Sequence, residues 1–324
     1  MPEQNYLEAI RSGLREEMSR DSSVYVFGED VALGGPFGVT KDLAEDLGKH
    51  RVINTPISEG TVMGLAIGAA TSRLRPVVEI MFIDFITLAM DQLVNHAAKL
   101  HYMSGGQLRV PLTVRVQCGA SGNMGAHHSQ SLEAWMAHVP GLKVVMPSSP
   151  SDAKGLLKAA IRDDNPVVFI EHRGLYWTRS QVPEGDHLVP IGEASVVRNG
   201  NDVTIVATAT LLGAALKAAE EVAADGISVE VIDPRTLSPL DIGTIVSSVK
   251  KTSRLIIAHE AVEQGGIGAE IAAQVQQEAI YDLDGPIMRV AAPLAPVPAS
   301  PALEKYFVPG KAEIVRAVKR AFNR

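Results

Sequence analysis

The feature that most constrains the fold is an alternation of short apolar runs with helical segments along the chain. The runs have the length of strands, and most are apolar at neighbouring positions rather than at every second one. Strands of this kind are buried on both faces, as in parallel sheets whose crossover helices cover either side. We therefore expect an α/β fold made of doubly wound, mostly parallel sheets.

The first part of the chain contains most of the predicted elements. Strands are expected at 24–27, 51–54, 77–82, 112–117, 142–146 and 167–171. Helices are expected at 7–18, 59–71, 84–102, 132–137 and 150–162. The last of these has a strong start, with Ser149 as its cap and Pro150 in its first turn. The 59–71 segment is apolar or small at nearly every position, which predicts a helix buried on all sides.

The second part repeats the alternation. Strands are expected at 203–207, 228–232, 255–259 and 287–290, and helices at 214–223, 241–249, 268–279 and 311–322. A chain of 324 residues usually forms two domains. The stretch 173–200 mixes prolines, glycines and polar residues, so we place a linker at 186–200. The predicted domains are then 1–185 and 201–324.

Composition excludes several classes of protein. A net charge of −7 argues against nucleic-acid binding, which usually needs a basic patch. The single cysteine, Cys118, cannot form an internal disulfide, and we expect it to be a small apolar residue at a strand end. The N-terminus lacks a signal-peptide core, and the longest apolar stretch, 62–70, is too short to span a bilayer. We therefore expect a cytoplasmic protein with no membrane partner.

Several motifs resemble the beta subunits of pyruvate, branched-chain 2-oxoacid and acetoin dehydrogenases, which depend on thiamine diphosphate. In the first domain they are Val26-Phe-Gly-Glu-Asp30, Asn54-Thr-Pro-Ile-Ser-Glu59, Arg75-Pro-Val-Val-Glu79, Tyr102-Met-Ser-Gly-Gly106, His127-His-Ser-Gln130, Pro140-Gly-Leu-Lys-Val144, Asp152-Ala-Lys-Gly155 and Arg162-Asp-Asp-Asn-Pro166. In the second they are Val231-Ile-Asp-Pro-Arg-Thr236, His259-Glu260 and Gly265-Gly266. The motifs follow the family's order across almost the whole chain. The resemblance implies a transketolase-like pyrimidine-binding domain followed by a transketolase C-terminal-like domain.

Glu59 is the first catalytic candidate that the resemblance implies. In the family the matching glutamate bonds a ring nitrogen of the cofactor's aminopyrimidine and so favours the imino tautomer that activates the thiazolium carbon. Without the resemblance, a glutamate at a helix start is explained by the helix dipole alone. With it, we expect Glu59 to be both catalytic and cofactor-binding.

Three further candidates come from the same resemblance. Phe85 would pack on the aminopyrimidine ring, and Ile57 would lie near the cofactor; a buried phenylalanine is otherwise ordinary core. His128 would lie beside the reacting carbon and help move protons during acyl transfer to lipoamide, a task that suits imidazole. We give its neighbour His127 no catalytic role, and we expect His259 to be structural or interfacial.

A potassium site is also implied. The matching residues are Leu112, Ala160, Ile161, Asp163 and Asn165. Most of the ligands would be backbone carbonyls, and the end of a helix carries unsatisfied carbonyls with partial negative charge. An ordinary helix end before Pro166 explains the same residues equally well.

The chain lacks the other half of a thiamine site. The cofactor's diphosphate is usually held through magnesium by Gly-Asp-Gly followed by Asn-Asn, and the chain contains no Gly-Asp-Gly. No phosphate-binding or dinucleotide fingerprint takes its place. In the family an alpha subunit supplies this half and holds the magnesium. The resemblance therefore implies a heterotetramer with an alpha subunit and a second beta subunit, which docks on a lipoyl acyltransferase core.

The implied reaction is oxidative decarboxylation of a 2-oxoacid with acyl transfer to lipoamide. The stretch Glu79-Ile-Met-Phe82 and the 102–106 motif favour pyruvate or acetoin over branched substrates, although Ile83 replaces an expected alanine. Pyruvate is our first choice, and acetoin and branched-chain 2-oxoacids stay open. A partner in a different thiamine system and a non-catalytic α/β scaffold are more distant hypotheses. The joint presence of Glu59, Phe85 and His128 argues against the scaffold.

Overall fold

The structure is a computed structural model that describes residues 1–322 of the chain. The chain divides into two units. Unit 1 comprises Met1–Cys118 and Trp135–Ile191. Unit 2 comprises Gly119–Ala134 and the chain from Gly192 onward. The chain thus passes between the units three times, after Cys118, Ala134 and Ile191, and the last of these positions falls within 186–200. The loop 119–134, which we expected in the first domain, belongs by its contacts to the second unit.

Unit 1 is built on a parallel sheet with the strand order β6-β7-β5-β4-β2-β3. Its strands are β2 (Val24–Gly28), β3 (Val52–Asn54), β4 (Arg75–Ile80), β5 (Thr113–Cys118), β6 (Lys143–Val145) and β7 (Val167–His172). Every residue of the central strands β5 and β7 is buried, as strands covered on both faces require. Cys118 ends β5 and is buried, as expected.

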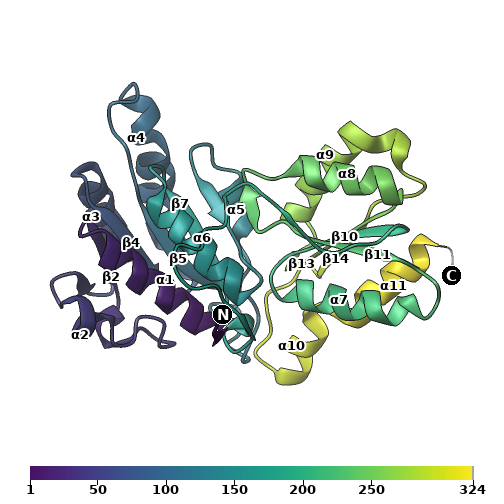
Figure 1. The fold of residues 1–324 in the computed structure, drawn as a ribbon, viewed down its shortest axis with the longest axis horizontal. Coiled ribbons are helices and arrows are strands. Elements are labelled where there is room, and N and C mark those ends of the chain that lie inside the picture. Colours follow the sequence, from purple (N-terminus) through teal and green to yellow (C-terminus); the bar gives the residue numbers. More distant parts are fainter. Residues whose placement is uncertain (323–324) are drawn as a thin grey trace. The chain divides into compact units, whose positions relative to one another are not determined.

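Two long helices of unit 1, α1 (Tyr6–Arg20) and α6 (Pro150–Arg162), run side by side (Figure 1). Asn5 and Glu8 form a capping box at the start of α1, and Ser149 caps α6. Ion pairs then join the helices, because the buried Lys158 contacts Glu16 at 2.7 Å. The predicted starts of both helices are confirmed.

Helix α3 (Glu59–Thr71) has the predicted bounds but not the predicted burial. Its apolar face packs on β4, whereas the opposite face is exposed along Thr61, Gly64, Leu65 and Gly68. Leu65 is 54% exposed. The prediction of burial on all sides is therefore wrong for the single chain, which leaves one apolar side of this helix uncovered.

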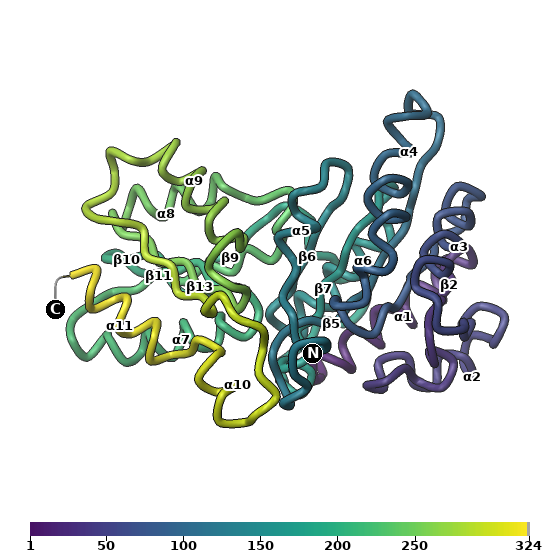
Figure 2. The backbone as a smooth tube through the Cα atoms, turned by 180° about the vertical axis from the view of Figure 1, so that it is seen from behind, coloured from purple at the N-terminus to yellow at the C-terminus, as the bar shows by residue number. Residues whose placement is uncertain are grey.

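The predicted helix 84–102 is three helical pieces rather than one. A 3₁₀ segment η2 (Ile83–Ala89) is followed by a π-helical segment η3 (Gln92–Ala97) and by α4 (Ala98–Met103). Figure 2 shows α3 beside the segment that ends in α4. The approach is close where the helix type changes, since a Cβ on Gly60 would lie 3.2 Å from the Leu88 carbonyl oxygen. π-Helical turns of this kind are frequent at functional sites.

The remaining elements of unit 1 are short. They are β1 (Glu3–Asn5), antiparallel to β8 (Arg179–Gln181), with η1 (Val31–Leu33), α2 (Leu43–Leu47), α5 (Glu133–Ala137) and η4 (Arg173–Leu175). The two strands, β1 and β8, pair residues that are far apart in the sequence. Pattern alone did not predict them.

Unit 2 has a second sheet with the order β14-β13-β10-β11-β9. Its strands are β9 (Ser195–Arg198), β10 (Val203–Ala207), β11 (Val229–Asp233), β13 (Leu255–Val262) and β14 (Met288–Ala292), with β12 (Thr236–Ser238) as a further short strand. All pairings are parallel except β9 with β11. The mostly parallel α/β architecture is therefore confirmed in both units.

Helices cover both faces of this sheet (Figure 1). One side carries α7 (Thr210–Ala223) and α11 (Lys311–Ala321), and the other carries α8 (Ile242–Thr252) and α9 (Ile267–Ala279). Two short helices, η5 (Ile280–Asp282) and α10 (Pro301–Phe307), complete the unit. The unit is doubly wound, as predicted.

Candidate functional site

A small pocket lies at the carboxyl ends of three neighbouring strands of unit 1, β2, β3 and β4. Its lining residues are Glu29, Thr55, Pro56, Ser58, Glu59, Val62, Glu79, Ile80, Met81 and Phe85. In open parallel sheets this edge is the usual place for a ligand. Glu59 and Phe85, two residues that the family resemblance implied for the cofactor, both line this pocket.

The first residue of α3 supplies one carboxyl group, that of Glu59, which is half-buried. A second carboxyl group comes from Glu29, directly after β2. Burial raises the pKa of Glu29, and repulsion from Asp30 and Glu59 raises it further. The pocket therefore holds two acids, and the charge of Glu59 is one cause of the raised pKa of Glu29.

Beneath the pocket lies a buried ionic network around Arg115. The guanidinium donates to Glu79 at 2.6 Å and to both carboxylate oxygens of Glu171, at 2.7 and 3.1 Å. Tyr176 also donates to Glu171, at 2.8 Å. Burial lowers the pKa of Arg115, but the two carboxylates outweigh it and raise that pKa overall. Glu79 and Glu171 thus share the one cation of Arg115. Burial raises the pKa of Glu171.

Two buried oxygen atoms of the pocket residues lack hydrogen-bond partners within residues 1–322. They are Oγ1 of Thr55 and Oε1 of Glu79, whose Oε2 is the atom bound to Arg115. Buried oxygens without partners are costly in a finished protein interior. Their presence at a pocket wall indicates a site for a ligand that offers hydrogen-bond donors.

The aromatic side of the pocket is held rigidly. The ring of Phe85 meets that of Phe82 edge to face, with centroids 5.7 Å apart and planes at 82°. Arg173 stacks over the Phe82 ring at 5.6 Å. Ile57, the other predicted cofactor contact, is 74% exposed and does not line the pocket, although its neighbours on either side do.

These groups fit an aminopyrimidine ring. The ring is flat and aromatic and carries an amino group, and the pocket offers Phe85, Val62 and Met81 as apolar contacts with Glu59 as a hydrogen-bonding acid. The oxygens of Thr55 and Glu79 described above can accept from an amino group.

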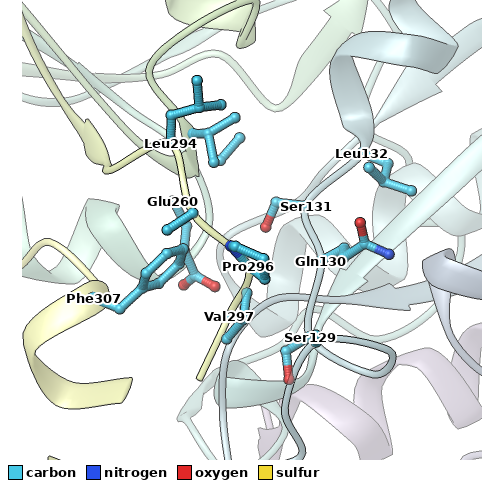
Figure 3. A pocket seen from close by; sticks show the side chains of 13 residues that line it. Ser129, Gln130, Ser131, Leu132, Glu260, Leu294, Pro296, Val297 and Phe307 are labelled. Atoms are coloured by element: carbon cyan, nitrogen blue, oxygen red, sulfur yellow. The ribbon is translucent and has the colours of Figure 1, made fainter. Parts of the chain in front are cut away.

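The other predicted catalytic residue, His128, lies in unit 2, on the loop 119–134. Its backbone N–H donates to the Gly125 carbonyl oxygen at 3.3 Å. The later residues of the loop line a cavity of about 400 Å³ whose other wall includes Glu260 and Phe307 (Figure 3). His128 is half-buried, whereas His127 is exposed.

Both parts of the chain match known domain families. The transketolase pyrimidine-binding domain family matches residues 3–178, and the transketolase C-terminal domain family matches residues 192–314. The pyruvate dehydrogenase E1 component subunit beta of Rhizobium meliloti is 47% identical over 314 residues, covering 96% of this chain and 68% of that protein.

The chain belongs to the beta subunits of the 2-oxoacid dehydrogenase family.

Two other relatives of this beta subunit differ in their named substrates. The acetoin:2,6-dichlorophenolindophenol oxidoreductase subunit beta of Cupriavidus necator is 45% identical, covering 97% of this chain and 96% of its own. The 2-oxoisovalerate dehydrogenase subunit beta of Bacillus subtilis is 44% identical, covering 95% and 96%. A solved structure described as a split gene transketolase, an inactive beta4 tetramer, has a TM-score of 0.79 at 24% identity and covers 98% of both chains. That structure supports the fold alone.

Sequence reasoning missed three pocket residues of the beta subunit: Glu29, Thr55 and Glu79. Each lies inside a family motif and at or just after a strand that ends at the pocket. The rule that ligands bind at the carboxyl ends of parallel strands would have found them. What the sequence did not show is the partner of Glu79, since Arg115 lies 36 positions away.

The five residues of the predicted potassium site lie around the end of α6, and four of their carbonyl oxygens already have partners. The carbonyls of Ile161 and Asp163 accept from Nη1 of Arg75 at 3.1 and 3.0 Å. Those of Ala160 and Leu112 accept backbone N–H groups, from Asp163 and Val167 respectively. A carbonyl keeps a second lone pair, so the oxygen ligands suit a hard cation, but a guanidinium already lies beside two of them.

His259 of the beta subunit is buried inside β13, against Gly266 and Gly268. Neither ring nitrogen has a hydrogen-bond partner within residues 1–322. Burial lowers the pKa of His259 to about 4; the nearby Ala261 backbone opposes this only in part, and Arg289 adds to it. A neutral buried imidazole agrees with the expected structural role.

No helix among the described residues is long and apolar enough to cross a bilayer.

Proposed function

We propose that the chain is the beta subunit of a heterotetrameric decarboxylase component that acts on pyruvate and transfers the acyl group to lipoamide. The observation that carries the proposal is the pocket that joins Glu59 and Phe85 over buried oxygens without partners. Acetoin and branched 2-oxoacids are the competing substrates, because relatives of all three kinds match almost equally well.

In this proposal each residue has a separate task. Glu59 shares a proton with a pyrimidine nitrogen, and Phe85 packs on the ring and fixes its plane. His128 bonds the substrate and moves a proton during acyl transfer. Thiamine diphosphate, when bound, supplies the carbon nucleophile. The same assignment of residue roles argues against a non-catalytic α/β scaffold.

The uncovered face of α3 supports the need for an alpha subunit. A helix that is apolar throughout is normally buried on all sides, yet Leu65 on α3 and Ile57 just before it are exposed. A partner that covers this face would bury both and would lie next to Glu59. The alpha subunit would also supply the ligands for magnesium and diphosphate, for which this sequence has no Gly-Asp-Gly.

Cofactor titration tests the half-site. The purified chain, titrated calorimetrically with thiamine diphosphate and magnesium, should bind weakly or not at all. The same chain co-expressed with the alpha subunit from its genomic neighbourhood should bind tightly and decarboxylate pyruvate faster than branched 2-oxoacids or acetoin. Tight one-to-one binding by the chain alone would refute the half-site, and a different order of rates would refute the substrate.

Partners beyond the alpha subunit rest on the family resemblance. We propose that unit 2 pairs beta subunits and presents the surface that docks the acyltransferase core. A chain that ends before Val203 should then fail to form a heterotetramer in size-exclusion chromatography with light scattering. An intact heterotetramer after this truncation would remove the role from unit 2.

A further inference from the structure

The loop that carries His128 is closed at its base and sharply bent along its length. The backbone N–H of Gly119 donates to the Gln130 carbonyl oxygen at 3.1 Å, which joins the two ends. Between them, Gly122, Asn123 and Gly125 have left-handed backbones, with φ of 87°, 60° and 73°. Glycine adopts positive φ freely, and asparagine does so more readily than other residues, so this sequence suits the bends.

Two acids of unit 2 hold the first half of the loop. Oε1 of Glu260 accepts from the Ala120 N–H at 2.5 Å, and Oε2 of Glu304 accepts from the Asn123 N–H at 2.9 Å. Glu260 is only 6% exposed, and its second oxygen accepts from the Thr210 hydroxyl at 3.3 Å. Hydrogen bonds from backbone N–H groups to carboxylates are among the stronger ones in proteins.

The second half of the loop borders a cavity. Ala126 and Ser129–Leu132 line the cavity of about 400 Å³, opposite Glu260, Pro296 and Phe307 (Figure 3). The first half, by contrast, has Ala120 packed in a small apolar cluster with Ala292, Val297 and Phe307. Gln130 follows His128 by two residues and is bonded to Gly119, which is next to Ala120. A shift of Ala120 away from Glu260 is therefore passed to the segment that carries the imidazole.

We propose that Glu260 is a positioning residue that fixes the loop 119–130 and thereby the imidazole of His128. The carboxylate touches neither a substrate nor the cofactor in this proposal; it acts through the Ala120 N–H. The inference rests on the proposed function for the role of His128, whereas the anchoring of the loop does not depend on it.

The first experiment measures the anchor itself, by hydrogen–deuterium exchange and mass spectrometry on the full chain. Glu260→Ala should speed exchange of the 119–130 amides roughly 10- to 100-fold, the effect of losing a hydrogen bond to a charged group. Glu260→Gln keeps an acceptor oxygen and should exchange close to the parent. Glu278→Ala, on the exposed face of α9, is the control and should change nothing in this loop. Parent-like exchange in Glu260→Ala, or equal acceleration throughout unit 2, would overturn the inference.

The second experiment measures the consequence, in the enzyme assembled with its alpha subunit. Glu260→Ala should shift the pH profile of acyl transfer to lipoamide, and Glu260→Gln should restore it. A variant that merely lowers the folded fraction would scale the whole profile without moving it, and that result would overturn the positioning role. If the loop exchanges faster but His128→Ala has full activity, the anchor is supported and the catalytic role in the proposed function fails.

Discussion

The two candidate sites differ in how the chain holds their residues. In unit 1, Glu59 begins a helix, Thr55 and Glu29 follow strands, and Glu79 is fixed by a buried guanidinium. In unit 2, His128 lies on a loop that hydrogen bonds fix at its base and first half. Secondary structure positions side chains more exactly than loops do. The first site should therefore tolerate few changes beneath it, whereas the second should respond to single hydrogen bonds.

Replacing the acid of unit 1 should give the largest effect. Glu59→Gln keeps the size and polarity of the side chain but cannot exchange a proton in the same way. General acid–base groups contribute roughly 10²–10⁴-fold, so we expect activity of the assembled enzyme to fall by that factor. The direct measurement is hydrogen–deuterium exchange at the thiazolium carbon of bound cofactor, which should be slow in the variant.

A matched control for this change is Glu45→Gln, an exposed glutamate in α2. It should keep both the activity and the exchange rate of the parent. If Glu59→Gln also exchanges at the parental rate, then Glu59 only serves the helix start, and the contrast between the two units loses its chemical basis.

The stability of unit 1 against unfolding should depend on Arg115. Arg115→Met would leave Glu79 and Glu171 buried without their cation, and removing one partner of a buried ion pair costs about 3–5 kcal/mol. Urea unfolding should show that loss. Arg316→Met, which removes an exposed pair with Glu313, should cost at most about 1 kcal/mol. Similar losses in both variants would mean that the network does not support the pocket.

The sequence predicted more of the fold than of the site. Strands such as 203–207 and the start of α6 follow from local patterns, so their bounds were found closely. The break of 84–102 into 3₁₀, π and α pieces was missed, because the local periodicity gives no sign of it; the break lies where Gly60 of α3 comes close to Leu88. The exposed face of α3 was missed for a related reason, since its apolar pattern fits a surface that this chain alone does not cover.

The same limit holds for the candidate site. Glu59 and Phe85 were named from the family resemblance, and the structure brings them into one pocket. Their support could not be found, because the bond from Arg115 to Glu79 and the one from Glu260 to Ala120 join residues far apart in the sequence. The attachment of loop 119–134 to unit 2 also depends on distant contacts, among them those of Glu260 and Glu304.

Lowering the pH should reduce the free energy of unfolding through the protonation of His259 in unit 2. The folded chain keeps this imidazole neutral to about pH 4, whereas an unfolded histidine takes up a proton near pH 6.5. Its contribution is therefore complete above pH 6.5 and falls as the pH drops toward 4. At 1.36 kcal/mol per pH unit, the loss between pH 6.5 and 5 is about 2 kcal/mol. Urea unfolding of parent and His259→Gln across this range should differ in slope, and equal slopes would show that His259 does not carry the effect.

Potassium should give the smallest effect, and it should act on unit 1. A ligand that binds only the folded state at ten times its Kd stabilises that state by about 1.4 kcal/mol, a shift of a few degrees in Tm. We therefore expect a higher Tm in potassium chloride than in sodium chloride at equal ionic strength, together with slower amide exchange at 160–165. Asn165→Ala should abolish the difference, whereas Asn201→Ala, at an exposed position of unit 2, should keep it. Equal Tm values in the two salts would mean that the Arg75 guanidinium alone satisfies the carbonyls of Ile161 and Asp163. The end of α6 would then be an ordinary helix terminus closed by a side chain.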